Sequence, residues 1–245
     1  MEASISNLTG HRAKYDRLSA SLPQNEVGVA FVGGGDAIMT GYQELEVLRA
    51  FKELRGASII DIGCGIGRLT SYLLEENVTE YLGLDIIPEI LAEAIDAARN
   101  GQNFKFAIAE NCKLPAADAA ADIVCGFSLI THLLDEEIFE YFTEARRVLR
   151  SDGIAVFSFL DFENTLHRQK FVQHARVHRH GHGDLTRFTT KSFLSLLAKE
   201  TGFPVTRFID PGQIAVRDSG RKILLDGRRA PEVARLGQTV CIMTA

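Results

Sequence analysis

The sequence predicts an α/β protein with a doubly wound, mostly parallel sheet and helices on both faces. Three observations favour this fold class. Strand-like and helix-like patterns alternate five times, a glycine-rich turn joins the first strand to its helix, and 245 residues suit one large domain. Right-handed crossovers in such a sheet distribute the helices over both faces. We therefore expect one domain over residues 1–245.

Composition is that of a globular protein without a membrane anchor. Hydrophobic residues make up 46% and charged residues 24% of the chain. No apolar run approaches the roughly 18 residues of a membrane span. Residues 1–10 lack a basic region followed by an apolar core, so they do not resemble a secretion signal. A cytoplasmic location is the expectation.

Charge is distributed unevenly along the chain. The net charge is −5, but residues 161–245 hold 14 Lys and Arg against 8 Asp and Glu, whereas residues 1–160 hold 13 against 24. A basic carboxyl-terminal third suits an anionic ligand, although a solvated basic face would give the same balance.

The four cysteines are scattered, at Cys64, Cys112, Cys125 and Cys241. They form no Cys-x-x-Cys pair, and three of them lie in apolar stretches. We expect buried or loop thiols and no metal or disulfide role.

The first 40 residues are irregular and are broken by Pro23, Gly28 and the run 33–35. We expect an amino-terminal arm or lid over residues 1–40. Residues 41–54 follow with apolar side chains at helical spacing, which predicts an amphipathic helix.

A glycine-rich turn is the most informative stretch. The apolar strand pattern 59–62 is followed by Gly63, Gly65 and Gly67, and a helical pattern runs from Arg68 to about residue 76. Glycines permit positive φ and let a ligand reach the free N–H groups of a helix start. Arg68 stands where a dinucleotide fingerprint has its third glycine, and no Gly-Lys-Ser/Thr sequence follows. A ligand-free tight turn is the simpler alternative.

Two acidic residues follow the next two predicted strands. Asp85 ends the strand 79–85, where a carboxylate can bind a ribose diol or simply cap the helix 88–100. Glu110 follows the strand 104–109, where it would face an adenine amine or lie in a surface loop.

The remaining elements follow the same alternation. The patterns predict a fourth strand at 122–127, a helix at 135–149, a turn at Ser151-Asp152-Gly153, a fifth strand at 154–160, a His- and Arg-rich insertion at 161–187, a helix at 193–201, a sixth strand at 205–210, a basic segment at 211–236 and a last strand at 239–243. We expect the two insertions, 161–187 and 211–236, to form the acceptor side of a site.

Taken together, these features resemble the class I S-adenosylmethionine-dependent methyltransferases, especially those that methylate small molecules. The resemblance covers about residues 41–210. Its marks are Asp61-Ile-Gly63-Cys-Gly65-Ile-Gly67-Arg68, Leu84-Asp85, Glu110 to Leu114-Pro115, Asp122-Ile-Val124, His132, and Arg147-Val-Leu149-Arg-Ser-Asp-Gly153. It implies the strand order 3-2-1-4-5-7-6 with an antiparallel last strand.

The resemblance also implies the cofactor S-adenosyl-L-methionine and roles for individual residues. The glycine turn would hold the methionine part, Asp85 the ribose hydroxyls and Glu110 the adenine amine. The family more often has Asp at that last position, so the backbone of Asn111 is an alternative adenine partner. The full set of expected cofactor contacts is Asp61, Gly63, Cys64, Gly65, Gly67, Arg68, Asp85, Ile86, Glu110, Asn111 and Phe127.

Methyl transfer from a sulfonium needs positioning more than a nucleophile or metal. An alcohol or amine acceptor must still lose a proton. His132, after the fourth strand, is the first candidate base and Asp161, after the fifth, the second. His174 and His178 have metal-ligand spacing, but a solvated helix face is the simpler reading.

The acceptor is expected to be a small molecule methylated on oxygen or nitrogen. The basic segments would suit a phosphate-bearing acceptor such as a nucleotide-linked sugar, and residues 208–213 and 236–242 loosely resemble methyltransferases of bacterial polysaccharide and sugar pathways. An RNA methyltransferase is less consistent with the acidic net charge and with Phe127-Ser-Leu-Ile after the fourth strand. An NAD-dependent oxidoreductase and a non-catalytic cofactor-binding regulator are the alternatives of another class.

Overall fold

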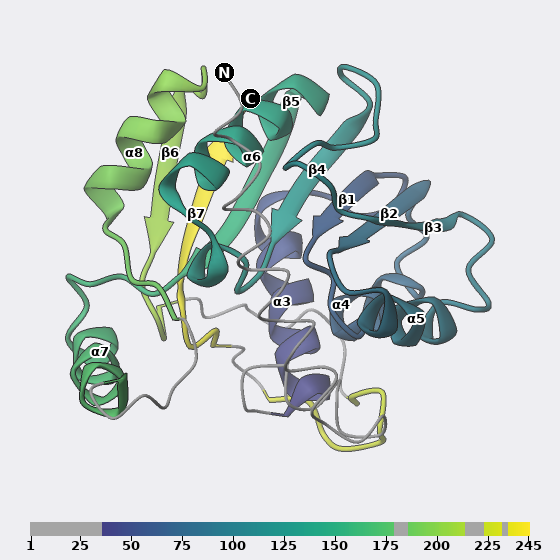
Figure 1. Ribbon diagram of the computed structural model, residues 1–245. Coiled ribbons are helices and arrows are strands. Elements are labelled where there is room, and N and C mark those ends of the chain that lie inside the picture. The colour runs from purple at the N-terminus through teal and green to yellow at the C-terminus, as the bar shows by residue number, and fades with distance from the viewer. Residues whose placement is uncertain (1–35, 179–185, 214–222, 232–234) are drawn as a thin grey trace.

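The computed structural model describes residues 36–178, 186–213, 223–231 and 235–245. Its centre is a seven-stranded sheet in the order β3-β2-β1-β4-β5-β7-β6, which confirms the predicted topology (Figure 1). The strands are β1 Ser58–Ile62, β2 Glu80–Asp85, β3 Phe104–Ile108, β4 Ala121–Gly126, β5 Leu149–Phe159, β6 Val205–Ile209 and β7 Thr239–Thr244. The helices are α3 Ala37–Phe51, α4 Arg68–Leu73, α5 Pro88–Ala97, α6 Asp135–Val148, α7 Thr165–His178 and α8 Lys191–Glu200.

Strand pairing brings the carboxyl ends of five strands to one edge of the sheet. β1 pairs in parallel with β2 and β4, β2 with β3, and β4 with β5. β7 runs antiparallel to both β5 and β6, as expected for the last strand. The loops after β1 to β5 therefore start side by side, which is where open α/β sheets bind ligands.

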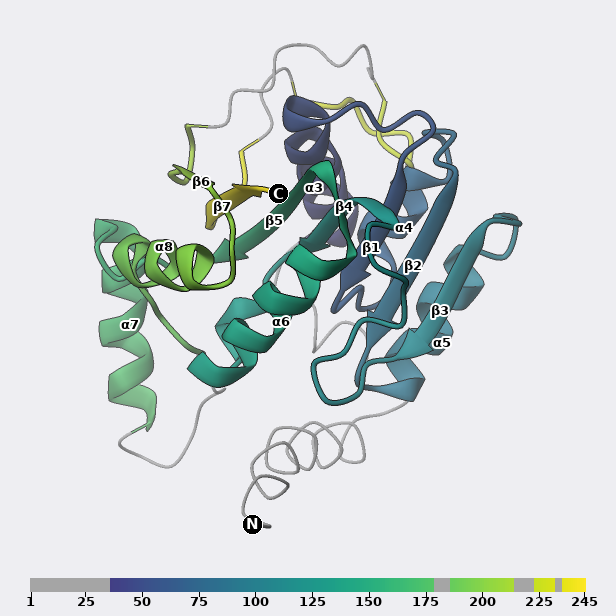
Figure 2. The ribbon, with the colours of Figure 1, turned by 90° about the horizontal axis from the view of Figure 1, so that it is seen from above.

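The helices form two layers on the sheet (Figure 2). Alternation along β1 divides its side chains between these layers. Ile59 belongs to the apolar cluster that contains residues of α3 and α4, whereas Ile60 and Ile62 belong to the cluster that contains residues of α6 and α8. α5 lies on the α4 side, packed on β2 and β3. The central parallel strands β1 and β4 are buried on both faces, which explains their largely apolar sequences.

Helix α6 illustrates why these segments fold as predicted. Ile138, Tyr141, Phe142 and Ala145 recur at helical spacing and are buried against the sheet. The first turn is acidic and the last turn basic, which complements the helix dipole. The Glu137 carboxylate accepts the Leu134 N–H at 2.6 Å and caps the start.

Several element boundaries differ from the sequence expectation, as three examples show. Helix α3 begins at Ala37 because the Asp36 side chain accepts the Met39 N–H at 3.1 Å. Helix α4 ends at Leu73, short of residue 76. The predicted turn at 151–153 lies inside strand β5, because the pairing with β4 shifts register there and a bulge absorbs the exposed polar residues.

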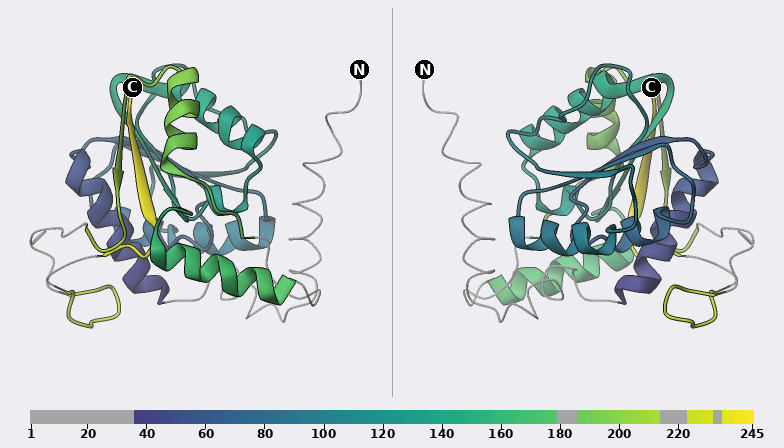
Figure 3. Two further views of the ribbon diagram at one scale, coloured as in Figure 1. Left: turned by 90° about the vertical axis from the view of Figure 1, so that its left-hand side faces the viewer. Right: turned by 90° about the vertical axis from the view of Figure 1, so that its right-hand side faces the viewer.

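The predicted insertion at 161–187 contains helix α7, which lies beyond the edge where the parallel strands end (Figures 1 and 3). Parts of three predicted segments lie outside the described residues: 179–185 of this insertion, 214–222 and 232–234 of the basic segment, and 1–35 of the expected arm. The side chain of His178 lies outside them as well. None of the described helices is long and apolar enough to cross a membrane.

Candidate functional site

The glycine turn after β1 uses its three glycines for different purposes. Gly63, Gly65 and Gly67 all have positive φ, at 72°, 58° and 82°. A Cβ at Gly67 would lie 3.0 Å from the Ala94 Cα, so this glycine lets α5 pack closely. A Cβ at Gly65 would meet no atom of the described residues within 4 Å. Gly65 therefore offers bare backbone to open space, as a ligand contact requires.

Asp85 at the end of β2 is joined directly to this turn. Its Oδ2 accepts the Gly65 N–H at 3.0 Å, and its Oδ1 accepts the Ile87 N–H at 3.0 Å. Burial raises the pKa of the carboxyl above its ordinary value, while the two backbone N–H groups act to lower it. Each oxygen keeps a further lone pair, so Asp85 can accept two more hydrogen bonds.

Asp61 lies beneath the turn. Its side chain is 3% exposed, and its Oδ2 accepts the Tyr81 hydroxyl proton at 2.9 Å. Burial, and next the charge of Glu44, raise the pKa of Asp61 to about 7. Asp61 remains a predicted cofactor contact, and its buried hydrogen bonds also support the turn.

Arg68 is also a predicted cofactor contact, and in the structure its side chain binds a neighbouring helix. Its guanidinium forms a fork with Glu44 of α3, at 2.5 and 3.0 Å. The Glu44 side chain is 2% exposed and the Arg68 side chain 15%. A guanidinium committed to a buried carboxylate ties α3 to the start of α4. The sequence did not predict Glu44 as the partner of Arg68, because Glu44 is 24 residues away in a different helix.

The loop after β3 carries the two predicted adenine contacts. Glu110 and Asn111 are both exposed. Asn111 and Cys112 have consecutive positive φ values of 51° and 53°, which is uncommon for residues with a side chain. The chain turns sharply here, and Lys113 N–H bonds the Glu110 carbonyl at 2.9 Å.

The apolar members of the predicted set flank the turn. Cys64 and Phe127 are each 6% exposed, and Ile86 is half-buried. Cys64 packs with Leu91 and Ala94 of α5, and burial raises the pKa of its thiol. All four cysteines are buried and free.

His132 ends a short 3-10 helix, Ile130–His132, that follows β4. The residue is half-buried, and its backbone N–H donates to the Leu129 carbonyl at 2.9 Å. It therefore lies on the same sheet edge as the glycine turn, with part of its surface accessible.

Asp161, the second candidate base, is 1% exposed. Its Oδ1 accepts the Glu163 N–H at 3.0 Å, and its Oδ2 lies 3.6 Å from the Lys191 ammonium. Its own N–H donates to Nδ1 of buried His167 at 2.9 Å. These contacts hold Asp161 in the local fold, and its carboxylate is largely shielded from solvent.

A polar triangle on this edge was not predicted. Ser158 Oγ accepts the Ser128 N–H and donates to Gln238 Oε1, both at 2.7 Å, and Gln238 Nε2 donates to Ser128 Oγ at 3.1 Å. It links the loop after β4 to β5 and to the segment before β7. Sequence separations of 30 to 110 residues left no local signal for it.

The insertion histidines whose side chains the structure describes, His167 and His174, make separate contacts. His174 of α7 packs edge-on against Phe188, with ring centroids 6.1 Å apart. Within the part of the chain that the structure describes, no group of three His, Cys, Asp or Glu side chains could hold a metal ion.

Comparison with known proteins gives related sequences and folds. Residues 59–153 match a family model described as a methyltransferase domain. An uncharacterised methyltransferase of Geobacillus sp. (strain WCH70) is 27% identical over 165 residues, which cover 66% of this chain and 76% of that protein.

Two solved structures share the fold. One is described as a methyltransferase dependent on S-adenosylmethionine, a possible histamine N-methyltransferase, from Thermotoga maritima; it has a TM-score of 0.59 and 16% identity, with 95% of each chain covered. The other is phosphoethanolamine N-methyltransferase 1 of Haemonchus contortus in complex with phosphoethanolamine and S-adenosylhomocysteine. Its TM-score is 0.60 at 20% identity, covering 96% of this chain and 48% of that chain. At such identities these two likenesses establish the fold alone.

Proposed function

We propose that this chain, which belongs to the class I S-adenosylmethionine-dependent methyltransferases, transfers the methyl group to an oxygen or nitrogen of a phosphate-bearing small molecule. The family, the methyltransferase activity and the cofactor are the premise. The class of acceptor and the roles of individual residues are the proposal.

The hydrogen bond between the Gly65 N–H and Asp85 is the main observation that supports the proposed cofactor site. It unites a bare backbone surface at the glycine turn with a buried carboxylate that has free lone pairs. Such a pair suits a ligand with a charged amino-acid part and a ribose diol. We assign the methionine part to the glycine turn, the ribose to Asp85 and the adenine to Glu110 with the backbone of Asn111.

The cofactor supplies a methyl group on a positively charged sulfur, which is its own leaving group. The chain has to hold the acceptor in line with that methyl and accept the proton that the acceptor loses. We assign the proton to His132, which is partly accessible on the edge, and not to Asp161, whose carboxylate is buried against Lys191.

A phosphate-bearing acceptor is supported by charge. The carboxyl-terminal third holds 14 basic against 8 acidic residues, and it includes α7, beyond the strand ends. The Haemonchus protein, which shares the fold, was solved with phosphoethanolamine. A sugar phosphate or a nucleotide-linked sugar would present the same anionic group.

Calorimetry tests the cofactor site. Asp85→Ala and Gly65→Arg should each weaken S-adenosylhomocysteine binding at least about tenfold, since one removes the ribose acceptor and the other fills the ligand space. Unchanged affinity in both variants would refute the assignment.

A second experiment tests the acceptor class by comparing methyl transfer to matched phosphorylated and dephosphorylated compounds. Transfer to the unphosphorylated members alone would exclude the proposed class.

A further inference from the structure

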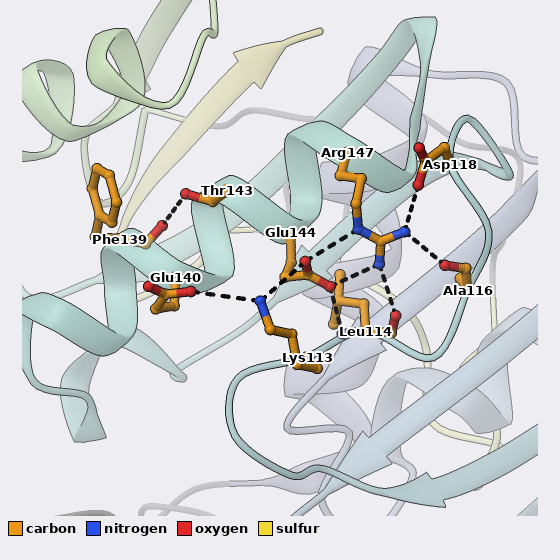
Figure 4. A network of polar contacts seen from close by, with 9 residues as sticks. All are labelled: Lys113, Leu114, Ala116, Asp118, Phe139, Glu140, Thr143, Glu144 and Arg147. Carbon is orange, nitrogen blue, oxygen red and sulfur yellow. Dashed lines mark hydrogen bonds and ion pairs between the residues drawn. The ribbon is translucent and has the colours of Figure 1, made fainter. Parts of the chain in front are cut away.

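The loop after β3 is held from outside by one helix. Residues 110–118, here called the adenine-side loop, run along α6, and two side chains of that helix bind the loop backbone (Figure 4). These are Glu144 and Arg147, one turn apart. Neither has a place in the proposed chemistry.

The bonds between helix and loop are numerous and short. Arg147 donates to the carbonyls of Leu114 at 3.0 Å and Ala116 at 2.9 Å, and to the Asp118 carboxylate at 2.8 Å. Glu144 accepts the Leu114 N–H at 3.0 Å and binds Arg147 at 2.7 Å. Three backbone groups of the loop are thus satisfied by two side chains that also bind each other.

The pair of Glu144 and Arg147, here called the clamp, is held in its charged form. The hydrogen bond from Arg147 is the main cause that lowers the pKa of Glu144 to about 2. Glu144 is 7% and Arg147 33% exposed at the side chain, so the pair is shielded from solvent more than a surface ion pair is. Lys113 is 62% exposed and lies 3.5 Å from Glu144, at the rim of the same cluster.

The adjoining residues explain why a clamp is needed. Asn111 and Cys112 both have positive φ, which asparagine adopts more readily than most residues but which costs free energy at Cys112. Leu114 is 2% exposed and anchors the loop in the core next to α6. The two residues with positive φ lie between β3 and this anchor, so the position of Glu110 and Asn111 depends on both ends being fixed.

We propose that Glu144 and Arg147 are positioning residues that hold the adenine-side loop so that Glu110 and the Asn111 backbone read the adenine of the cofactor. This inference rests on the proposed adenine site. Loosening the clamp should therefore weaken recognition of the base specifically, while the glycine turn and Asp85 keep their geometry.

The test compares two ligands on the full-length protein. S-adenosylhomocysteine and S-inosylhomocysteine differ in the exocyclic amine, which the inosine compound replaces with a carbonyl. The wild type should prefer the adenosine compound about tenfold or more. Arg147→Ala should weaken binding of the adenosine compound about tenfold and bring the two affinities close together.

Arg146→Ala is the matched control. Arg146 is the adjacent basic residue of α6, but its Nε donates to the Gly202 carbonyl at 3.1 Å, away from the loop. It should keep the wild-type preference. Arg147→Lys keeps the charge without the fork and should recover only part of the preference. Glu144→Gln, which keeps the shape, replaces Arg147→Ala should the latter fail to fold.

The outcomes separate this inference from the proposed function. A wild type without preference for adenine, or clamp variants that keep the preference or weaken both ligands equally, would overturn the inference. Asp85→Ala serves as the benchmark. If it leaves S-adenosylhomocysteine affinity unchanged, the cofactor site itself fails, whatever the clamp variants do.

Discussion

The two halves of the sheet edge, which we propose to bind the cofactor and the acceptor, are built in different ways. On the cofactor side, after β1 to β3, the surface is made of backbone: three glycines with positive φ and the N–H groups that bind Asp85. On the acceptor side, after β4 and β5, it is made of side chains that reach across the fold, as in the triangle of Ser128, Ser158 and Gln238.

The two halves also differ in the buried interactions that lie beneath them. Beneath the glycine turn lies a buried charged group, in which Glu44 binds Arg68 and Asp61 binds Tyr81. The acceptor side has the hydrogen bonds of buried His167 and an ion pair of Asp161 with Lys191, whose side chain is 30% exposed. We infer that the cofactor side is intolerant of change, and that the acceptor side can vary without affecting the cofactor. The following substitutions test that contrast.

The largest effect is expected from Glu44→Ala on the cofactor side. It leaves the Arg68 guanidinium largely buried and unpaired, which should destabilise the fold by about 3–5 kcal/mol in urea denaturation. S-adenosylhomocysteine affinity should fall with it. Glu80→Ala removes an exposed pair with Lys105 in the same half of the sheet and should cost about 0.5 kcal/mol or less. Equal costs for the two variants would contradict the special role of the buried group.

Asp61→Asn should change how stability depends on pH. The folded-state pKa of Asp61 is raised from 3.8 to about 7, so the folded state retains its proton longer than the unfolded state. Its contribution is complete below about pH 4 and is lost as the pH rises through 7, by about 2–4 kcal/mol. Asn cannot ionise, so the variant should lose this slope between pH 4 and 8. Denaturation across that range measures it, with exposed Asp96→Asn as control.

His167→Ala probes the acceptor side. Since Nδ1 accepts the Asp161 N–H, the proton lies on Nε2, which donates to the Gly237 carbonyl at 3.0 Å. Losing both bonds and the buried ring should cost about 2–3 kcal/mol and speed proteolytic cleavage of α7. S-adenosylhomocysteine affinity should stay within about twofold of wild type, because the sites are separate. A large loss of S-adenosylhomocysteine affinity would contradict the inference that the acceptor side can vary without affecting the cofactor.

Gln238→Ala should have the smallest effect. It removes two hydrogen bonds of a half-buried side chain, and water can replace part of them, so the cost should be about 1 kcal/mol. Cofactor affinity should again be unchanged. The measurement that matters is the KM of an active acceptor, which should rise as the loop bearing His132 loosens. An unaltered KM would show that the triangle of Ser128, Ser158 and Gln238 does not influence acceptor binding.

Local patterns were sufficient for the fold. Strand and helix periodicity, the glycines and the strand-ending Asp85 are encoded within short stretches, and the sheet order follows from their resemblance to a family. The turn expected at Ser151 to Gly153 was wrong because a bulge depends on the partner strand β4. The pairing of Arg68 with Glu44 was not visible in the sequence.

The sequence by itself determined the alternating α/β architecture, the position of the glycine turn and the carboxylate that follows β2, because backbone conformation is set by neighbouring residues. Only the tertiary structure decided that Asp61 and Arg68 support the turn from below, that Asp161 is buried, and that Glu144 and Arg147 hold the adenine-side loop. Each of these depends on burial or on hydrogen bonds between distant segments, and such contacts exist only once the chain has folded.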